Sequence, residues 1–256
     1  MSGRFIDNTK LIRLMCFWGK EGIIIKSNRR TAIFLGLLLI FSFIFGILSS
    51  VPALEQPDYL EKLPEIEMQV LVAIFFQAAM AVVYVIITVL LYPIIKKYNK
   101  GLAVGYFGFR IIGAGFLFAS IGSLLLLLWL SQNFVAANQA NSAYFEIIAE
   151  LLRQGRDILN HIGMILPWSI GGLILYFCLY KIKLIPRWLS IWGIIGSSFT
   201  LVATLILMLN IITLMNPVYF ILNAPLAFCE LFFAIFLIVR GFNPTDIKPN
   251  EYGDRL

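Results

Sequence analysis

Six long apolar runs separated by short polar segments dominate the hydropathy pattern of this 256-residue chain. They cover residues 31–51, 68–95, 102–130, 158–180, 186–215 and 220–239. A helix needs about 20 apolar residues to cross a hydrocarbon core of about 30 Å, and every run reaches that length. The pattern therefore predicts an all-α polytopic membrane protein, with six transmembrane helices in one bundle.

Composition supports a lipid environment and a single membrane domain. Apolar residues make up 60% of the chain and charged residues 13%, and the mean hydropathy is +0.89. A soluble domain has about 25% charged residues, so much of this surface is expected to avoid water. We expect a basic amino-terminal segment at 1–30, a transmembrane domain at 31–240 and a tail at 241–256.

The distribution of basic residues predicts the orientation in the membrane. Sixteen of the 20 lysines and arginines fall in the amino terminus, after the second and fourth runs, and at the carboxyl end. Lys62, Arg153 and Arg156 fall on the other side, together with eight of the 14 carboxylates. Because basic segments stay cytoplasmic, both termini are expected inside.

Two segments outside the runs have the spacing of short interfacial amphipathic helices. In the amino-terminal segment the apolar positions are Leu11, Leu14, Met15 and Trp18; a disordered basic tail is the alternative. In the longest connection, residues 143–153 place Ile147, Ile148 and Leu151 opposite Glu146 and Glu150. We expect that second helix to lie on the outer surface, with Leu151 and Ile148 turned toward lipid or the bundle.

Two charged residues interrupt the apolar runs at similar depth. Counted from the cytoplasmic ends at 1.5 Å per residue, Arg110 and Ser197 lie about 12 Å deep and Glu230 about 15 Å. Charges this deep are costly unless paired, so Arg110 and Glu230 are predicted to form a buried ion pair on neighbouring helices. Ser197 and Tyr84 complete an inner polar layer. The pair could act as a gate or charge-reading site, or only fix helix packing.

A second polar layer is predicted in the outer half of the bundle. Its members come from different runs: Gln77, Asp157, His161, Asn210 and Asn223. They could form an outward-open vestibule, in which Asp157 and His161, four residues apart, share a helix face and form a proton-sensitive pair. The alternative for His161 is an ordinary wet position near a helix end.

Several classes of chemistry are disfavoured by the residues that the chain contains. A single histidine excludes multi-histidine metal sites and a haem held by two imidazoles, so no metal or cofactor is expected. The chain has no phosphate-binding glycine loop, its serines lack a general base at matching depth, and its basic residues form no nucleic-acid-binding face. An enzymatic function is therefore the least favoured interpretation.

Three segments resemble a bacterial integral-membrane family, domain of unknown function 4386. They are YFGFR at 106–110, the turn LIPRWLSIWG at 184–193, and PLAFCE at 225–230 with RGF at 240–242. The resemblance implies a six-helix bacterial membrane protein in which Arg110 and Glu230 are family positions. Gly113 stands where the family often has a carboxylate, so Arg110 needs a partner elsewhere. The family implies no substrate, cofactor or reaction.

The leading interpretation is a multi-pass protein of the bacterial inner membrane that binds or passes a small solute, lipid or ion between its helices. The main rival is a structural or partner-binding role, and an intramembrane enzyme is third. The expected partners are the bilayer, a small solute or lipid ligand, and a second copy or another membrane protein; no nucleic acid is expected.

Overall fold

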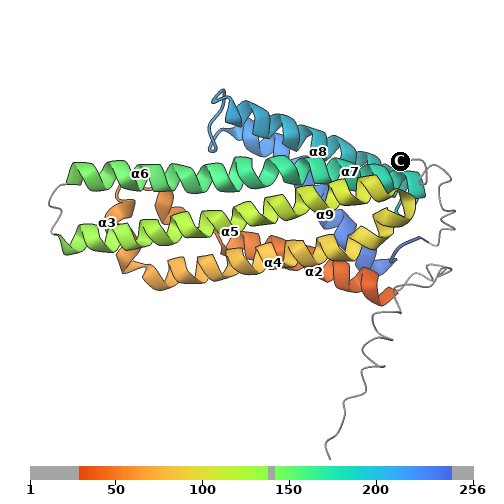
Figure 1. Cartoon of the computed structure of the whole chain (residues 1–256), viewed down its shortest axis with the longest axis horizontal. Coiled ribbons are helices and arrows are strands. Elements are labelled where there is room, and N and C mark those ends of the chain that lie inside the picture. The colour runs from red at the N-terminus through yellow and green to blue at the C-terminus, as the bar shows by residue number, and fades with distance from the viewer. Residues whose placement is uncertain (1–28, 138–141, 244–256) are drawn as a thin grey trace, which may run out of the picture.

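The computed structural model describes residues 29–137 and 142–243, and these are helical apart from short connections (Figure 1). The helices are α2 (Arg29–Leu48), η1 (Pro52–Glu55), α3 (Tyr59–Glu65), α4 (Glu67–Tyr98), α5 (Lys100–Ala136), α6 (Ser142–Ile158), the π-helical turn η2 (Leu159–Met164), α7 (Ile165–Ile182), α8 (Arg187–Met208) and α9 (Pro217–Val239). With α6, η2 and α7 counted as one continuous helix, six are long and apolar enough to span a membrane. The predicted fold class is confirmed. The predicted helix around Leu11 and Trp18 lies outside the described residues.

The six spans pack into a closed ring. α2 contacts α4, α4 contacts α5, α5 contacts α7, α7 contacts α8, α8 contacts α9, and α9 returns to α2. Glycines allow the close approaches, because a Cβ at Gly36 would lie 2.7 Å from the Ala234 carbonyl oxygen and one at Gly196 would lie 2.9 Å from the backbone of Leu226. In this ring α5 and α9 lie on opposite sides.

Three of the spans are much longer than a bilayer core requires. α4 has 32 residues, α5 has 37, and the continuous helix Ser142–Ile182 has 41, so they reach about 48 to 62 Å. Figure 1 shows them continuing past the ends of α2, α8 and α9, where α3 packs among them. This extension lies at the end away from the basic turns, called the outer end after the predicted orientation, and it has its own core, which includes Leu54, Leu63, Leu124 and Leu127.

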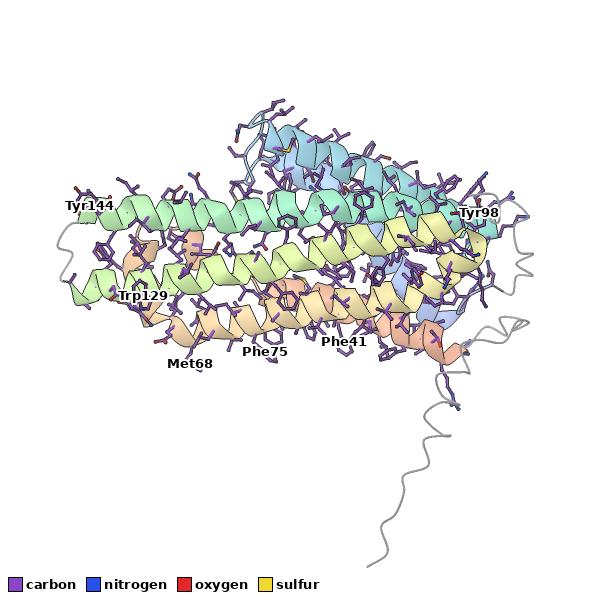
Figure 2. The ribbon with its side chains drawn as sticks, viewed as in Figure 1. Phe41, Met68, Phe75, Tyr98, Trp129 and Tyr144 are labelled. Carbon is purple, nitrogen blue, oxygen red and sulfur yellow. The ribbon has the colours of Figure 1, made fainter. Side chains whose placement is uncertain are left out.

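The outside of the ring is apolar, as a lipid-facing surface requires. Exposed side chains run along its length (Figure 2), with Phe75 at 67% exposure and Trp129 at 62%. Basic residues gather at the end where α4 turns into α5 and α7 turns into α8, including Lys96, Lys97 and Arg187. These features identify a multi-pass membrane protein and place the basic turns on one side, as the sequence predicts.

α6 forms the amphipathic helix predicted at 143–153, but it does not lie across the surface. It continues through η2 into α7 as one long helix. Its apolar stripe faces outward, with Ile147 and Leu151 each 70% exposed, whereas the side chains of Arg153 and Asp157 are 24% and 15% exposed. The face turned toward the other helices is mixed: it includes Ala149, which is 0% exposed, and Phe145 and Leu152, which pack against the neighbouring core, together with Arg153 and Asp157.

The fifth span ends earlier than its apolar run. α8 stops at Met208, and Asn210 adopts a left-handed conformation with φ of 56° that begins the turn before α9. The sequence predicted a helix to residue 215 because residues 211–215 are mostly apolar. Apolarity alone does not distinguish a helical turn from an exposed loop, and the φ of Asn210 ends the helix.

Candidate functional site: two cavities inside the helix ring

Arg110 is buried between α5 and α7, with 3% of its surface exposed. Its side chain fits there because Gly171 has no side chain: a Cβ at this position would lie 3.1 Å from the Arg110 Cγ and Nε atoms. The guanidinium carbon lies 3.6 Å from the centroid of the Trp168 ring, a cation–π contact. The Nε atom is buried and has no hydrogen-bond partner among the described residues.

The direct ion pair between Arg110 and Glu230 predicted from the sequence is not formed in this structure. Among the described residues no basic atom lies within 4.0 Å of the Glu230 carboxylate. Their helices, α5 and α9, are not neighbours but face each other across the ring. Trp168 lies next to both groups, since its ring contacts the guanidinium and it lines the same cavity as Glu230.

Glu230 lines an inner cavity of about 160 Å³ between five of the spans. The residues that line it are Phe43, Tyr84, Met164, Ile165, Trp168, Thr200, Asn223, Leu226, Ala227 and Glu230. Thr200 is 3% exposed, and its hydroxyl has no hydrogen-bond partner within the described chain. A buried polar group without a partner costs free energy, so this hydroxyl is a site where a ligand or water would be stabilised.

The other members of the predicted inner polar layer surround the same region. Tyr84 lines the inner cavity, and its ring centroid lies 4.0 Å from that of Trp168. Ser197 does not line the cavity; it is buried against Gly172, where a Cβ would lie 2.7 Å from the serine hydroxyl. The structure thus brings Arg110, Glu230, Tyr84 and Ser197 together around Trp168 and the Gly171-Gly172 pair.

Above this cavity the long helix changes from α-helical to π-helical over η2. A π-helical turn contains one more residue than an α-helical turn, and such turns occur frequently at functional sites. It begins at Leu159 and carries Asn160, His161 and Met164, all of which line an outer cavity of about 240 Å³. Met164 and Ile165 line both cavities, so the two cavities adjoin at these residues.

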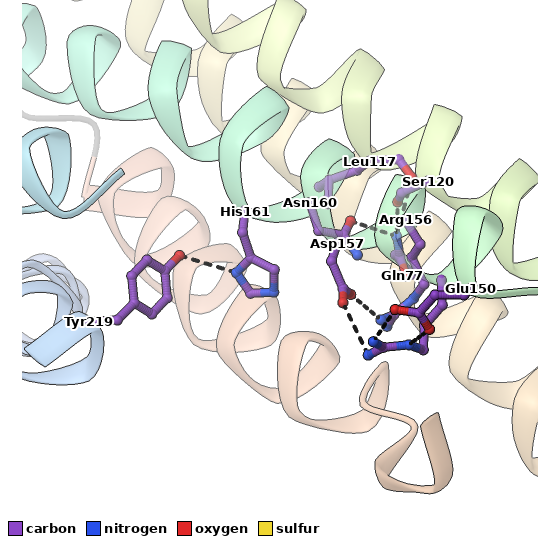
Figure 3. Close-up of polar contacts among 10 residues, drawn as sticks. Gln77, Leu117, Ser120, Glu150, Arg156, Asp157, Asn160, His161 and Tyr219 are labelled. Carbon is purple, nitrogen blue, oxygen red and sulfur yellow. Dashed lines mark hydrogen bonds and ion pairs between the residues drawn. The ribbon is translucent and has the colours of Figure 1, made fainter. Parts of the chain in front are cut away.

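The outer cavity has polar residues from the segment after α2, from α4, from α6 and from η2, together with apolar residues such as Met80 and Leu117. The polar residues include Ser49, Ser50, Gln77, Arg156, Asn160 and His161. The Gln77 amide nitrogen donates to the Asn160 side-chain oxygen at 3.2 Å and to the Leu117 carbonyl oxygen at 3.2 Å, and it also contacts the Ser120 hydroxyl (Figure 3). This network holds α4, α5 and η2 together at the mouth of the ring.

Asp157 and His161 do not pair with each other. Asp157 contacts Arg156 at 3.2 Å and Arg153 at 3.9 Å, and Arg153 is held in turn by two hydrogen bonds to Glu150. The His161 ring instead contacts the Tyr219 hydroxyl on α9, with 3.1 Å between Nδ1 and the oxygen (Figure 3). The predicted proton-sensitive pair is replaced by a charge cluster on α6 and a separate contact between η2 and α9.

The two asparagines of the predicted outer layer have different places. Asn223 lines the inner cavity, and its amide nitrogen donates to the Tyr219 carbonyl oxygen at 2.8 Å. Asn210 is exposed in the turn after α8 and lines neither cavity. Its backbone conformation, rather than its side chain, determines its position.

Residues central to this site were missed by the sequence reasoning, above all Trp168 and Thr200. Both residues lie within apolar runs and have no distinguishing pattern, and only the neighbouring Pro167 indicated a local bend in the helix. Within residues 29–137 and 142–243, no group of three or more histidine, cysteine or carboxylate side chains is placed to hold a metal ion. The site therefore consists of aromatic, hydroxyl, amide and single charged groups.

The chain belongs to the family described as domain of unknown function 4386, whose model matches residues 34–241. This match covers all six spans and both cavities. No curated protein and no solved structure matches the chain.

Proposed function

We propose that this membrane protein binds a small molecule in the inner cavity, and that the molecule enters from the outer side through the second cavity. The observation that carries the proposal is the buried, unpartnered Thr200 hydroxyl on the wall of a cavity that also contains the Glu230 carboxylate. Polar groups in such positions are expected to face a ligand or water, because a polar group without a hydrogen-bond partner inside the membrane costs free energy.

The arrangement of the two cavities supports entry from the outer side. They adjoin at Met164 and Ile165, which line both cavities. Methionine is unbranched and flexible, so it suits a position that must move aside. Toward the basic end, by contrast, the ring is filled by a continuous core that includes Leu35, Ile95 and Leu179. We therefore propose binding from outside, and passage across the membrane would require that core to open.

The alternative is a structural role, in which Arg110, Trp168 and Glu230 only fix the packing of the ring. Such a role would be satisfied by a dry interior with every polar group paired. The buried hydroxyls of Tyr106, Ser190 and Ser197 also lack partners in the part of the chain that the structure describes, but they line neither cavity; the Thr200 hydroxyl lines the inner cavity, and this position favours binding over the alternative.

The experiment compares cysteines at two positions of one helix, tested with a positively charged, membrane-impermeant thiol reagent added from outside. The background lacks Cys16, Cys178 and Cys229. Thr200→Cys places the thiol at the inner cavity. Thr204→Cys is the matched control: it lies one turn closer to the outer end of α8, is 0% exposed, and lines neither cavity.

If the cavities form an aqueous path, Thr200→Cys reacts although it is deeper, and Thr204→Cys stays protected. Gln154→Cys, exposed on α6, confirms that the reagent is active. The proposal fails if Thr204→Cys reacts as fast as Thr200→Cys, or if Gln154→Cys reacts and Thr200→Cys does not.

A further inference from the structure

We infer that the inner cavity takes an organic cation, namely an ammonium group that carries a small apolar or aromatic body. This inference rests on the proposed function, because it names the substrate class of the same cavity. The first observation is charge: Glu230 is the only formally charged residue among those that line the cavity.

The charge of Glu230 is not neutralised by direct contact within the described chain. Arg110, the basic residue that interacts with it, lies beyond 4.0 Å and does not line the cavity. Its side chain is held against Gly171 and its guanidinium against Trp168. Charged groups inside a membrane are almost always paired, so a ligand in the cavity is expected to bring a positive charge to the carboxylate.

The walls of the inner cavity suit a cation as well. Three aromatic rings, Phe43, Tyr84 and Trp168, line it, and aromatic faces attract ammonium groups most strongly where water is excluded. Thr200 offers a hydroxyl oxygen without a partner. The Asn223 amide nitrogen is already used by Tyr219, which leaves its oxygen as an acceptor. An ammonium ion has up to three N–H donors, and these acceptors match it.

An anionic ligand fits the same surroundings poorly. It would need a basic group on the cavity wall, and the lining contains none. In the outer cavity Arg156 is basic, but its guanidinium contacts Asp157 at 3.2 Å, so this pair does not give the entrance a net positive charge. The two cavities together therefore favour a cation or a neutral molecule, and the Glu230 carboxylate distinguishes between these.

The size of the inner cavity limits the body of the ligand. Its volume of about 160 Å³ is close to that of an engineered apolar cavity of about 150 Å³ that holds one benzene molecule. A single ring with a short aminomethyl group is therefore a suitable probe. Benzylammonium, benzyl alcohol and benzoate have nearly the same shape and differ in charge, so they separate charge recognition from simple apolar binding.

The experiment measures binding of these three probes to the full-length protein in lipid nanodiscs by equilibrium dialysis, with empty nanodiscs subtracted. Benzylammonium is expected to bind about tenfold or more tighter than benzyl alcohol, because hydrogen bonds to charged groups are stronger than neutral ones. Benzoate is expected not to bind. Glu230→Gln removes the preference for the cation, whereas Glu230→Asp, which keeps the charge, retains most of it.

The result that overturns the inference is binding of benzyl alcohol or benzoate as tightly as benzylammonium, or an unchanged preference in Glu230→Gln. The comparison of the three probes on the unmodified protein needs no variant, so a folding defect in Glu230→Gln does not affect it. If the thiol reagent reaches Thr200→Cys but no probe prefers a positive charge, the cavity binds ligands of another class. If the reagent does not reach it and no probe binds, the proposed function fails as well.

Discussion

Gly171 makes room for the buried Arg110 side chain, and replacing it with alanine tests the arrangement around Trp168. The new Cβ would lie 3.1 Å from the Arg110 Cγ and Nε atoms and 3.3 Å from Cδ. Three atoms of one side chain would have to shift together by a few tenths of an ångström. The guanidinium has little room to move away, because it also contacts the Trp168 ring at 3.6 Å and lies 5.6 Å from the centroid of the Tyr106 ring.

The expected cost follows from three contributions. Overpacking a filled interior costs about 1 to 3 kcal/mol. A shift of a few tenths of an ångström weakens, without removing, the cation–π contact, whose full loss would cost about 2 kcal/mol or more. Alanine in place of glycine returns at most about 1 kcal/mol of helix propensity. We therefore expect Gly171→Ala to lower the free energy of unfolding by about 1 to 3 kcal/mol, measured by equilibrium unfolding in mixed detergent micelles.

Gly115→Ala on α5 is the matched control, because a Cβ there would meet nothing within 4 Å. It should leave stability unchanged or raise it slightly through helix propensity. A second comparison uses an Arg110→Ala background, in which the Arg110 side-chain atoms that the new Cβ would meet are absent. There, Gly171→Ala should lower the free energy of unfolding little further. The reasoning is refuted if Gly171→Ala is as stable as Gly115→Ala, or if its cost is the same in the Arg110→Ala background.

Two further predictions concern charged groups. In a double-mutant cycle with Arg110→Met and Glu230→Gln, we expect a coupling free energy of about 1 kcal/mol, because Trp168 separates the charges. Breaking a buried pair in direct contact costs about 3 to 5 kcal/mol. Thermal unfolding of the four proteins measures the coupling, and a value above about 3 kcal/mol would contradict the structure. Arg153→Met removes two hydrogen bonds to Glu150, whose side chain is 41% exposed, so we expect a loss of about 0.5 to 1 kcal/mol by the same assay, with an unchanged midpoint as the contrary result.

The amino-acid sequence by itself determined the class of the protein and the number of spans, and it predicts their orientation. These properties depend on local chemistry: about 20 consecutive apolar residues cross a bilayer as a helix wherever their neighbours lie, and the basic turns act independently of packing. The sequence also identified Arg110, Glu230 and Tyr84 as polar groups of the interior, because any polar group at that depth must avoid lipid.

Only the tertiary structure decided which of these groups meet. Depth along each helix predicted that Arg110 and Glu230 were partners, but the order of helices around the ring places α5 opposite α9 and inserts Trp168 between the charges. Helix order depends on close contacts at small residues such as Gly36 and Gly196, and hydropathy does not encode it. The tertiary structure likewise decided which face of α6 turns toward the bundle. The residue spacing of α6 predicts two faces, but which face turns inward depends on the helices packed against it.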